Sequence, residues 1–295
     1  MASFRLGLHL TNLEWPDLQP RELLARLTEI AAAAEQAGFD SIWLPDHAIQ
    51  QPPGGGPNAP ILEPYVTLGA LAAVTDRARL GALVTPVTFR APALIAKTIT
   101  TLDVLSRGRA VLGIGAGWVA DEHHAYGLDF PPTAERQDRL EEAVQICQAM
   151  LNHPAPADFA GRHYRVTGAI NQPRPAQDRI PILIGGGGER RTLRAVARYA
   201  DVCNINGDPD TVRHKLDVLV HHCQDIGRNP AEIIATAAFV PHDGEGYLAQ
   251  TADYLKAGVN GVILLTTTCP NADAVSSWGQ ALANTFPTLR PTPDR

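Results

Sequence analysis

Short apolar runs alternate with longer amphipathic segments from residue 4 to residue 286 of this chain. The apolar runs have the length of strands, and the longer segments repeat apolar residues with the period of a helix. In residues 21–38, for example, Leu23, Leu27 and Ile30 fall on one face. The strands carry few polar residues, which is expected of a parallel sheet whose two faces are both covered.

The number of strand–helix units predicts an α/β protein with a (β/α)8 TIM barrel, in one domain over residues 1–295. A doubly wound open sheet is the alternative. The expected strands cover 4–10, 40–46, 79–87, 110–117, 180–185, 201–205, 232–240 and 260–267, and the expected helices cover 21–38, 65–76, 91–106, 135–151, 190–200, 210–227, 246–258 and 272–286.

Two stretches interrupt the alternation. Residues 49–64 form a loop rich in Pro and Gly after the second strand, and residues 152–179 form an insertion between the fourth helix and the fifth strand. Within the insertion, residues 161–171 have the pattern of a hairpin. Loops of this length are usually functional or disordered, and loops after barrel strands lie at the mouth where active sites are built.

Composition excludes several classes of function. The chain has a net charge of −6 and no long basic run, so we expect no nucleic-acid partner. No segment approaches the roughly 18 apolar residues of a membrane span, and the N-terminus lacks the pattern of a signal peptide. The four cysteines are scattered without CxxC spacing, so we expect reduced thiols. These features predict a cytoplasmic protein.

Four consecutive glycines, Gly185 to Gly188, follow the fifth expected strand and precede a helix. Free backbone N–H groups at such a junction can converge on an anion, and the helix dipole favours negative charge. Arg190 and Arg191 add positive charge nearby. A tight turn is the alternative, but it needs fewer glycines. The run therefore predicts a phosphate site, although no P-loop lysine follows it.

Other candidate groups end the expected strands. Asp46 and His47 follow the second strand, where a barrel enzyme places acids and bases, and Asp46 is the expected hydrogen-bond acceptor for His47. The alternative is that Asp46 caps the following loop and His47 lies on the surface. His9 and Asn12 near the first strand are weaker candidates. The glycine-rich turn 113–118 could let a flat ring lie against the backbone, or it could be an ordinary strand–helix turn.

No HExxH or GxSxG motif occurs, so we expect no metal site. We expect instead that a cofactor supplies the chemistry.

Taken in order, 40–47, 80–118, 135–146, 161–166, 171–201 and 212–233 resemble the bacterial luciferase-like oxidoreductases, and most of all the branch that uses the deazaflavin coenzyme F420. The resemblance implies a barrel with an insertion. It implies His47 beside the reactive ring and a cis peptide at Leu83–Val84 under the ring. The other cofactor-binding residues it implies are Thr85, Ala116, Gly117, Trp118, Gly185, Gly186, Gly187, Gly188, Asn204 and Asn206, with Arg190, Arg194 and Lys215 for an acidic tail.

One position departs from the family pattern. Sugar-phosphate dehydrogenases of the family carry a glutamate after the fourth-strand glycine turn, where this chain has Trp118. Asp121 or Glu122, one turn later, could replace it, and Asp121 is also expected to contact the cofactor. If Trp15, Trp43 and Trp118 all face inward, they would suit an apolar or cyclic substrate.

The resemblance therefore implies an oxidoreductase that transfers a hydride between F420 and a small organic substrate (an activated C=C, C=N or carbinol), with His47 handling the proton. Alternatives are an FMN-dependent monooxygenase with a reductase partner, a flavin-binding barrel without turnover, and a phosphosugar enzyme without redox chemistry. Family members are often dimers, so a homodimer is possible.

Overall fold

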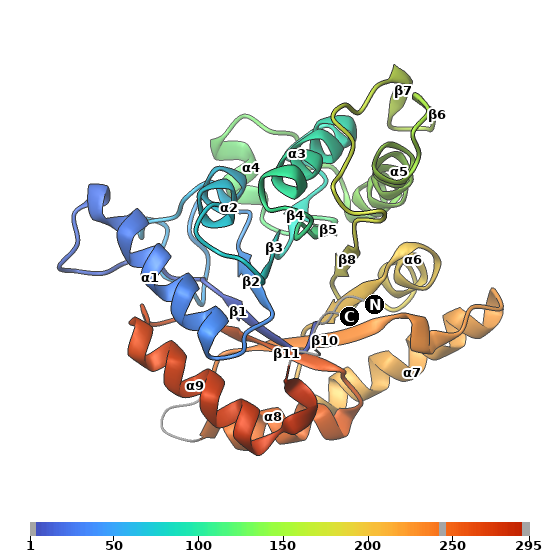
Figure 1. Cartoon of the computed structure of the whole chain (residues 1–295). Coiled ribbons are helices and arrows are strands. Elements are labelled where there is room, and N and C mark those ends of the chain that lie inside the picture. The colour runs from blue at the N-terminus through green and yellow to red at the C-terminus, as the bar shows by residue number, and fades with distance from the viewer. Residues whose placement is uncertain (1–3, 242–245, 291–295) are drawn as a thin grey trace.

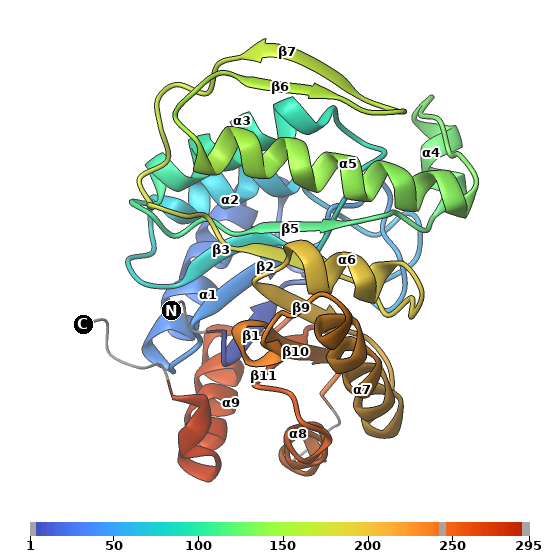
Figure 2. The same ribbon diagram turned by 90° about the vertical axis from the view of Figure 1, so that its right-hand side faces the viewer.

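The computed structural model describes residues 4–241 and 246–290, and the parallel strands of this part curve into a nearly closed barrel (Figures 1 and 2). Their spatial order is β3-β2-β1-β11-β10-β9-β8-β5-β4. The predicted barrel is confirmed. The barrel strands are β1 (Leu6–His9), β2 (Ser41–Leu44), β3 (Arg79–Ala82), β4 (Thr85–Pro86), β5 (Leu112–Gly115), β8 (Ile182–Gly185), β9 (Val202–Ile205), β10 (Ile234–Phe239) and β11 (Gly261–Leu265).

Strands β3 and β4 are two halves of the single strand expected at 79–87. β4 pairs with β5, and Leu80 of β3 forms a parallel bridge with Ala110, so β3 and β5 close the barrel around the interruption. Gly113 lies at this seam, where a Cβ would overlap the carbonyl oxygen of Ala82. Only glycine allows the two backbones to approach this closely.

Helices surround the barrel in both views (Figures 1 and 2). Each of the eight expected helices is present, within a few residues of its expected ends. The short α4 was not predicted, because six residues carry too little periodicity to recognise. The helices are α1 (Leu23–Gln36), α2 (Pro64–Ala72), α3 (Pro92–Leu105), α4 (Ala120–Ala125), α5 (Thr133–Asn152), α6 (Thr192–Tyr199), α7 (Pro209–Asp225), α8 (Gly246–Ala257) and α9 (Ala272–Thr285), with 3-10 turns at Pro20–Glu22, Pro230–Glu232 and Pro287–Leu289.

Local sequence explains where several helices begin. α2 and α7 each start at a proline, whose missing N–H costs nothing in a first turn. The preceding residue caps the helix in both cases. Glu63 accepts a hydrogen bond from the amide of Val66 at 2.7 Å, and Asp208 accepts one from Thr211 at 2.8 Å. Within the described residues, no helix is long and apolar enough to cross a membrane.

Two buried layers hold the fold together. The larger one packs the helices against the outer face of the barrel. The smaller one fills the barrel interior near the amino ends of the strands, and Leu83, Val84 and Ala238 pack on top of it. This inner cluster consists of Phe4, Trp43, Val111, Leu183, Val202 and Ile263. In the described residues it fills the amino-terminal end of the barrel interior and forms the floor below the carboxyl ends of the strands.

The insertion contains an antiparallel hairpin of β6 (Ala157–Ala160) and β7 (Arg165–Ala169), which lies over α5 (Figure 2). A hairpin was expected at 161–171, but only its second strand falls there. The first strand begins earlier, in a segment whose Pro and Asp residues hid the strand pattern.

Candidate active site

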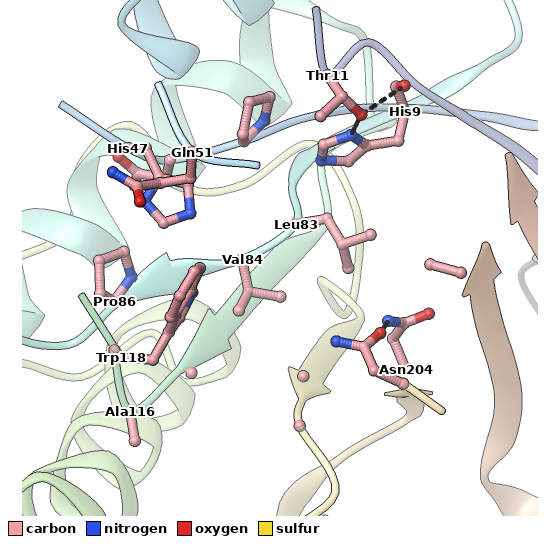
Figure 3. Close-up of a pocket in the computed structure, with 18 of the residues that line it drawn as sticks. His9, Thr11, His47, Gln51, Leu83, Val84, Pro86, Ala116, Trp118 and Asn204 are labelled. Carbon is pink, nitrogen blue, oxygen red and sulfur yellow. Dashed lines mark hydrogen bonds between the residues drawn. The ribbon is translucent and has the colours of Figure 1, made fainter. Parts of the chain in front are cut away.

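A cavity of about 370 Å³ opens at the carboxyl ends of the barrel strands (Figure 3). Every barrel strand from β1 to β11 contributes a residue at or just beyond its carboxyl end, which is where barrel enzymes build their sites. The loop 49–64 and helices α4, α5 and α6 complete the wall. The lining residues are His9, Thr11, Pro45, Asp46, His47, Gln50, Gln51, Pro52, Pro53, Leu83, Val84, Pro86, Gly115, Ala116, Gly117, Trp118, Glu122, Gln137, Gly185, Gly186, Thr192, Asn204, Asn206, Ala238 and Leu265.

His47 lines the cavity and is held by Glu122. Nδ1 of His47 lies 2.8 Å from Oε1 of Glu122, and the other carboxylate oxygen accepts the amide N–H of Ala48 at 3.0 Å. Glu122 is almost fully buried, whereas the His47 side chain keeps 19% of its exposure. Because an ionised carboxylate only accepts, neutral His47 carries its proton on Nδ1 and leaves Nε2 for a ligand.

Asp46 does not pair with His47, so the expected partnership is wrong. Its carboxylate is buried against Arg90, with Nη1 at 2.6 Å and Nη2 at 3.2 Å, and it accepts the hydroxyl of Thr85 at 2.8 Å. Tyr65 in turn contacts the Thr85 hydroxyl. Burial raises the pKa of Asp46, and Arg90 opposes that rise. The contact between Asp46 and Thr85 ties the end of β2 to β4. Asp46 is therefore a supporting residue that borders the cavity.

His9 lies in the wall near the floor of the cavity. Its Nδ1 lies 2.7 Å from the hydroxyl of Thr11, and Figure 3 marks this contact with a dashed line; the residue is 4% exposed. Burial lowers the pKa of His9 to about 4, although a backbone hydrogen bond to Leu83 favours the charged form. The ring is therefore neutral at physiological pH. His9 offers a polar surface to a ligand but no positive charge.

The Leu83–Val84 peptide is cis, as the resemblance implied. Both side chains line the cavity and interrupt the strand between β3 and β4. The next residue, Thr85, was expected to touch the cofactor. In the structure Thr85 is fully buried behind the cavity wall, and its hydroxyl donates a hydrogen bond to Asp46. Alternation along β4 explains this, because successive side chains point to opposite faces.

The turn after β5 brings Ala116, Gly117 and Trp118 to the cavity. Gly117 has φ of 77°, and a Cβ there would press on Thr88 and Pro86 at 3.1 and 3.2 Å, so the turn requires glycine. Trp118 is 66% exposed and stands edge-on to His47, with 5.8 Å between ring centroids.

Asp121, expected as a cofactor contact, is exposed and does not line the cavity. Its neighbour on α4, Glu122, turns inward instead, because successive residues on a helix point in different directions.

Two of the four glycines, Gly185 and Gly186, line the cavity. The amide of Gly186 donates to the carbonyl of Asn204 at 3.1 Å. Gly187 and Gly188 lie just outside the lining, and no group in the described part of the chain accepts a hydrogen bond from their amides. A Cβ on Gly187 would overlap Nζ of Lys215, so the ammonium lies directly against this backbone.

The N-terminus of α6 completes this end of the cavity. Thr192 lines the cavity, and its hydroxyl lies 3.3 Å from Oε1 of Gln137, another lining residue. Among the described residues, no carboxylate lies within ion-pair distance of Lys215. We call the backbone of 186–188 with Thr192 and Lys215 the anion cradle. It combines the free amides of Gly187 and Gly188, a hydroxyl, an ammonium and a helix N-terminus, which together suit a phosphate.

Asn204 and Asn206, at the end of β9, line the cavity beside the anion cradle. Nδ2 of Asn204 lies 3.2 Å from Oδ1 of Asn206. The arginines expected for an acidic tail lie elsewhere. Arg190 is exposed and outside the lining, and Arg194 pairs with Glu141 of α5 at 3.3 Å. Lys215 alone of these three candidates reaches the cradle.

The expected wall of three tryptophans is also wrong. Trp43 belongs to the buried floor and is 1% exposed, and Trp15 donates to the carbonyl of Pro270 outside the lining. Asn12 is likewise outside the lining and donates to the carbonyl of Thr267. Trp118 is therefore the single tryptophan of the described cavity wall.

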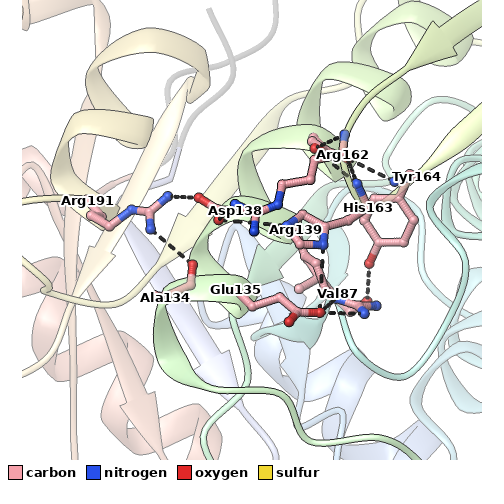
Figure 4. A network of polar contacts seen from close by, with 10 residues as sticks. Val87, Ala134, Glu135, Asp138, Arg139, Arg162, His163, Tyr164 and Arg191 are labelled. Atoms are coloured by element: carbon pink, nitrogen blue, oxygen red, sulfur yellow. Dashed lines mark hydrogen bonds and ion pairs between the residues drawn. The ribbon is translucent and has the colours of Figure 1, made fainter.

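The hairpin turn contacts both α5 and the chain after β4, and Figure 4 shows Tyr164 next to Val87. Glu142 of α5 accepts the backbone amides of Arg162, His163 and Tyr164, at 2.7 to 3.3 Å. The hydroxyl of Tyr164 then donates to the carbonyl of Val87 at 3.1 Å, directly after β4. The insertion thus braces the strand that carries the cis peptide.

Sequence reasoning missed several lining residues. Gln50, Gln51, Pro52 and Pro53 belong to the loop 49–64, which was noted only as a long loop at the mouth. Its position after a strand was a usable signal, but nothing in its sequence showed which residues turn inward. Gln137 and Thr192 come from helices, where one polar residue on a buried face is easily read as surface.

Comparisons with known proteins agree with this fold. Residues 4–285 match the family model described as luciferase-like monooxygenase. The F420-dependent glucose-6-phosphate dehydrogenase of Microbacterium testaceum is 37% identical over 200 residues, which cover 67% of this chain and 56% of the relative. Among solved structures, an F420-dependent secondary alcohol dehydrogenase in complex with an F420-acetone adduct aligns with a TM-score of 0.80 and 20% identity, over 97% of this chain and 99% of that one. The monooxygenase RslO1 from Streptomyces bottropensis aligns with a TM-score of 0.79 and 17% identity, over 96% and 98%.

The chain spans about half to two thirds of the length of the curated relatives it matches, since the matched share of the relative ranges from 49% to 66%. At 17% and 20% identity, the two solved structures show a shared fold. They include a dehydrogenase and a monooxygenase, so the fold alone does not distinguish between these two activities.

Proposed function

This chain belongs to the luciferase-like monooxygenase family, and we propose that it is an oxidoreductase that binds coenzyme F420 in the barrel cavity. The observation that carries the proposal is the pairing of two features across one cavity. The anion cradle lies at one end, and His47, held by Glu122, lies in the wall. A phosphate-bearing redox cofactor needs both an anion site and a proton-handling group near its ring.

The residues of the cradle fit a cofactor phosphate. The amides of Gly187 and Gly188 have no acceptor in the described part of the chain, and Lys215 supplies a positive charge beside them. A side chain at Gly187 or Gly188 would fill the space that the ammonium and the Thr192 hydroxyl border. These donors would hold the phosphate, and Asn204 would contact the part of the cofactor next to it.

Leu83, Val84 and Ala116 would support and orient the ring. When bound, the deazaflavin supplies hydride chemistry, and the protein supplies orientation and proton transfer. Nε2 of His47 has no protein partner among the described residues, so this atom would take or give the proton of the substrate. Glu122 fixes the ring of His47 and its tautomer, which makes Glu122 a positioning residue.

The choice of F420 over FMN rests on the relatives. Several curated proteins 34% to 38% identical to this chain are F420-dependent glucose-6-phosphate dehydrogenases. The cradle would accept the phosphate of either cofactor. Arg191 and Arg194 do not extend the positive charge beyond Lys215, because both pair with carboxylates of α5.

The small substrate would react through an activated C=C, C=N or carbinol. A homodimer and a cytoplasmic location stay predictions from the sequence.

The proposal is tested by titrating the protein in parallel with F420, FMN and NADPH and following tryptophan fluorescence, since Trp118 lines the cavity. Preference for F420 is expected. Preference for FMN would favour the monooxygenase alternative, and F420 binding without turnover on a panel of acceptors and alcohols would favour a binding protein.

A further inference from the structure

The charged groups around His47 are all acidic. Asp46 and Glu122 line the cavity, and no lysine or arginine does so among the described residues. Both carboxylates already have partners, because Arg90 neutralises Asp46 from behind the wall and Glu122 accepts from His47 and Ala48. The described lining therefore offers no cation to an anionic ligand near His47.

The uncharged neighbours of His47 are amide, proline and indole groups. Figure 3 shows Gln51 and Trp118 on the same side of the cavity as His47, with Asn204 on the other side. Pro52 and Pro53 follow Gln51 in the wall. The side chain of Gln51 donates to the carbonyl of Ile49 at 3.0 Å, so its amide is held within its own loop. This surface offers flat apolar contact and a few neutral polar atoms.

A phosphate group placed here would be unfavourable. It carries up to two negative charges, and here it would lie beside the carboxylate of Glu122 with no cation of the described lining to pair with it. The cation of the cavity region is Lys215, and it lies against Gly187 in the anion cradle. Arg191, directly before α6, pairs with Asp138 instead, and Arg194 of α6 pairs with Glu141.

From this distribution we propose that the substrate held at His47 is an uncharged compound without a phosphate, so that the chain does not use glucose 6-phosphate as its relatives do. The inference rests on the proposed function, because it assigns Lys215 to the cofactor phosphate. The reacting hydroxyl or carbonyl of the substrate hydrogen-bonds to Nε2 of His47, and its apolar part lies on Trp118 and Pro52. The site discriminates against a phosphorylated substrate because the negative charge of the phosphate would have no cation to pair with near His47.

The test uses the protein loaded with F420, with loading followed by the fluorescence of F420 itself. Glucose and glucose 6-phosphate share the same reacting carbinol and differ in the phosphate, so they form a matched pair. Their dissociation constants from the loaded protein are measured by calorimetry, and F420 reduction by absorbance. The variant Gln51→Lys places an ammonium beside His47, and Gln51→Met is its uncharged control.

The wild-type protein is expected to show no advantage for glucose 6-phosphate over glucose in affinity or rate. Gln51→Lys is expected to raise the ratio of affinities in favour of the phosphate at least about tenfold, and Gln51→Met is not. A wild-type protein that binds F420 and prefers glucose 6-phosphate would overturn the substrate inference and leave the proposed function standing. A Gln51→Lys variant with an unchanged ratio would overturn the charge argument. A protein that does not take up F420 contradicts the proposed function itself, and the substrate inference falls with it.

Discussion

Glu122 holds His47 by one carboxylate oxygen and the amide of Ala48 by the other, at 2.8 and 3.0 Å, across 75 positions of sequence. This contact ties the end of β2 to the helix α4 that follows β5. It fixes the imidazole that faces the cavity, and it makes α4 part of the site although the helix has only six residues.

Glu122→Gln is expected to lower kcat about 10- to 100-fold, because a neutral amide orients His47 less firmly and stabilises its charged form less. The dissociation constant of F420 should change little, since Glu122 is not in the anion cradle. Steady-state kinetics and cofactor titration measure the two effects separately. Asp121→Asn, one residue earlier on an exposed position, is the matched control and should retain wild-type kcat. Equal losses in kcat and cofactor affinity would point to a merely structural role for Glu122.

Gly187→Ala is expected to weaken F420 binding about tenfold or more, because the new Cβ would displace the ammonium of Lys215 from the cradle. The fold should survive, since the displaced group is the flexible end of a side chain. Gly69→Ala in α2 adds a methyl group where nothing lies within 4 Å, and it serves as the control. If both variants bind F420 like the wild type, the cradle does not hold the phosphate.

His9 should make the free energy of unfolding depend on pH. Burial lowers its pKa from 6.5 to about 4 in the folded protein. Between these values the unfolded chain binds a proton that the folded protein excludes, so stability is present above pH 6.5 and is lost as the pH falls toward 4. The loss amounts to about 3 kcal/mol at most. In His9→Asn this slope should be smaller, as urea unfolding at several pH values would show. Parallel curves for the two proteins would contradict the assignment.

Glu142→Ala is expected to loosen the hairpin turn, because three backbone amides at 162–164 lose their acceptor. Each unpaired amide can turn to water, so the expected loss of stability is about 1 to 3 kcal/mol. Hydrogen exchange should accelerate at these three amides before it does in the barrel strands. Glu29→Ala, which removes an exposed ion pair with Arg26, should leave them protected. Unchanged exchange in Glu142→Ala would show that the hairpin is held by other contacts.

The fold could be predicted because its signals are repeated. Each strand–helix unit shows the same change of hydrophobic period, so an error in one unit does not alter the topology. The boundaries were less accurate. The single strand expected at 79–87 is divided at the cis peptide, which the resemblance placed but no periodicity reveals.

The site was predicted in part, for a physical reason. Residues that end strands, such as His47 and Asn204, are brought together by any barrel, so their position in sequence was informative. The partner of His47 could not be predicted from sequence position, because Asp46 and Glu122 are both carboxylates near strand ends. Glu122 contacts the imidazole because Asp46 already forms an ion pair with Arg90. Tryptophan gave a misleading signal in the same way, since Trp43 serves the buried floor.

The central claim is that the anion cradle grips the phosphate of a deazaflavin. The most direct measurement is a fluorescence titration with F420 and with the same deazaflavin lacking the phosphate, on the wild type and on Lys215→Met. The account predicts that the wild type binds F420 at least about 100-fold more tightly than the phosphate-free compound, and that Lys215→Met loses most of this difference. Equal affinity of the wild type for the two compounds would contradict it.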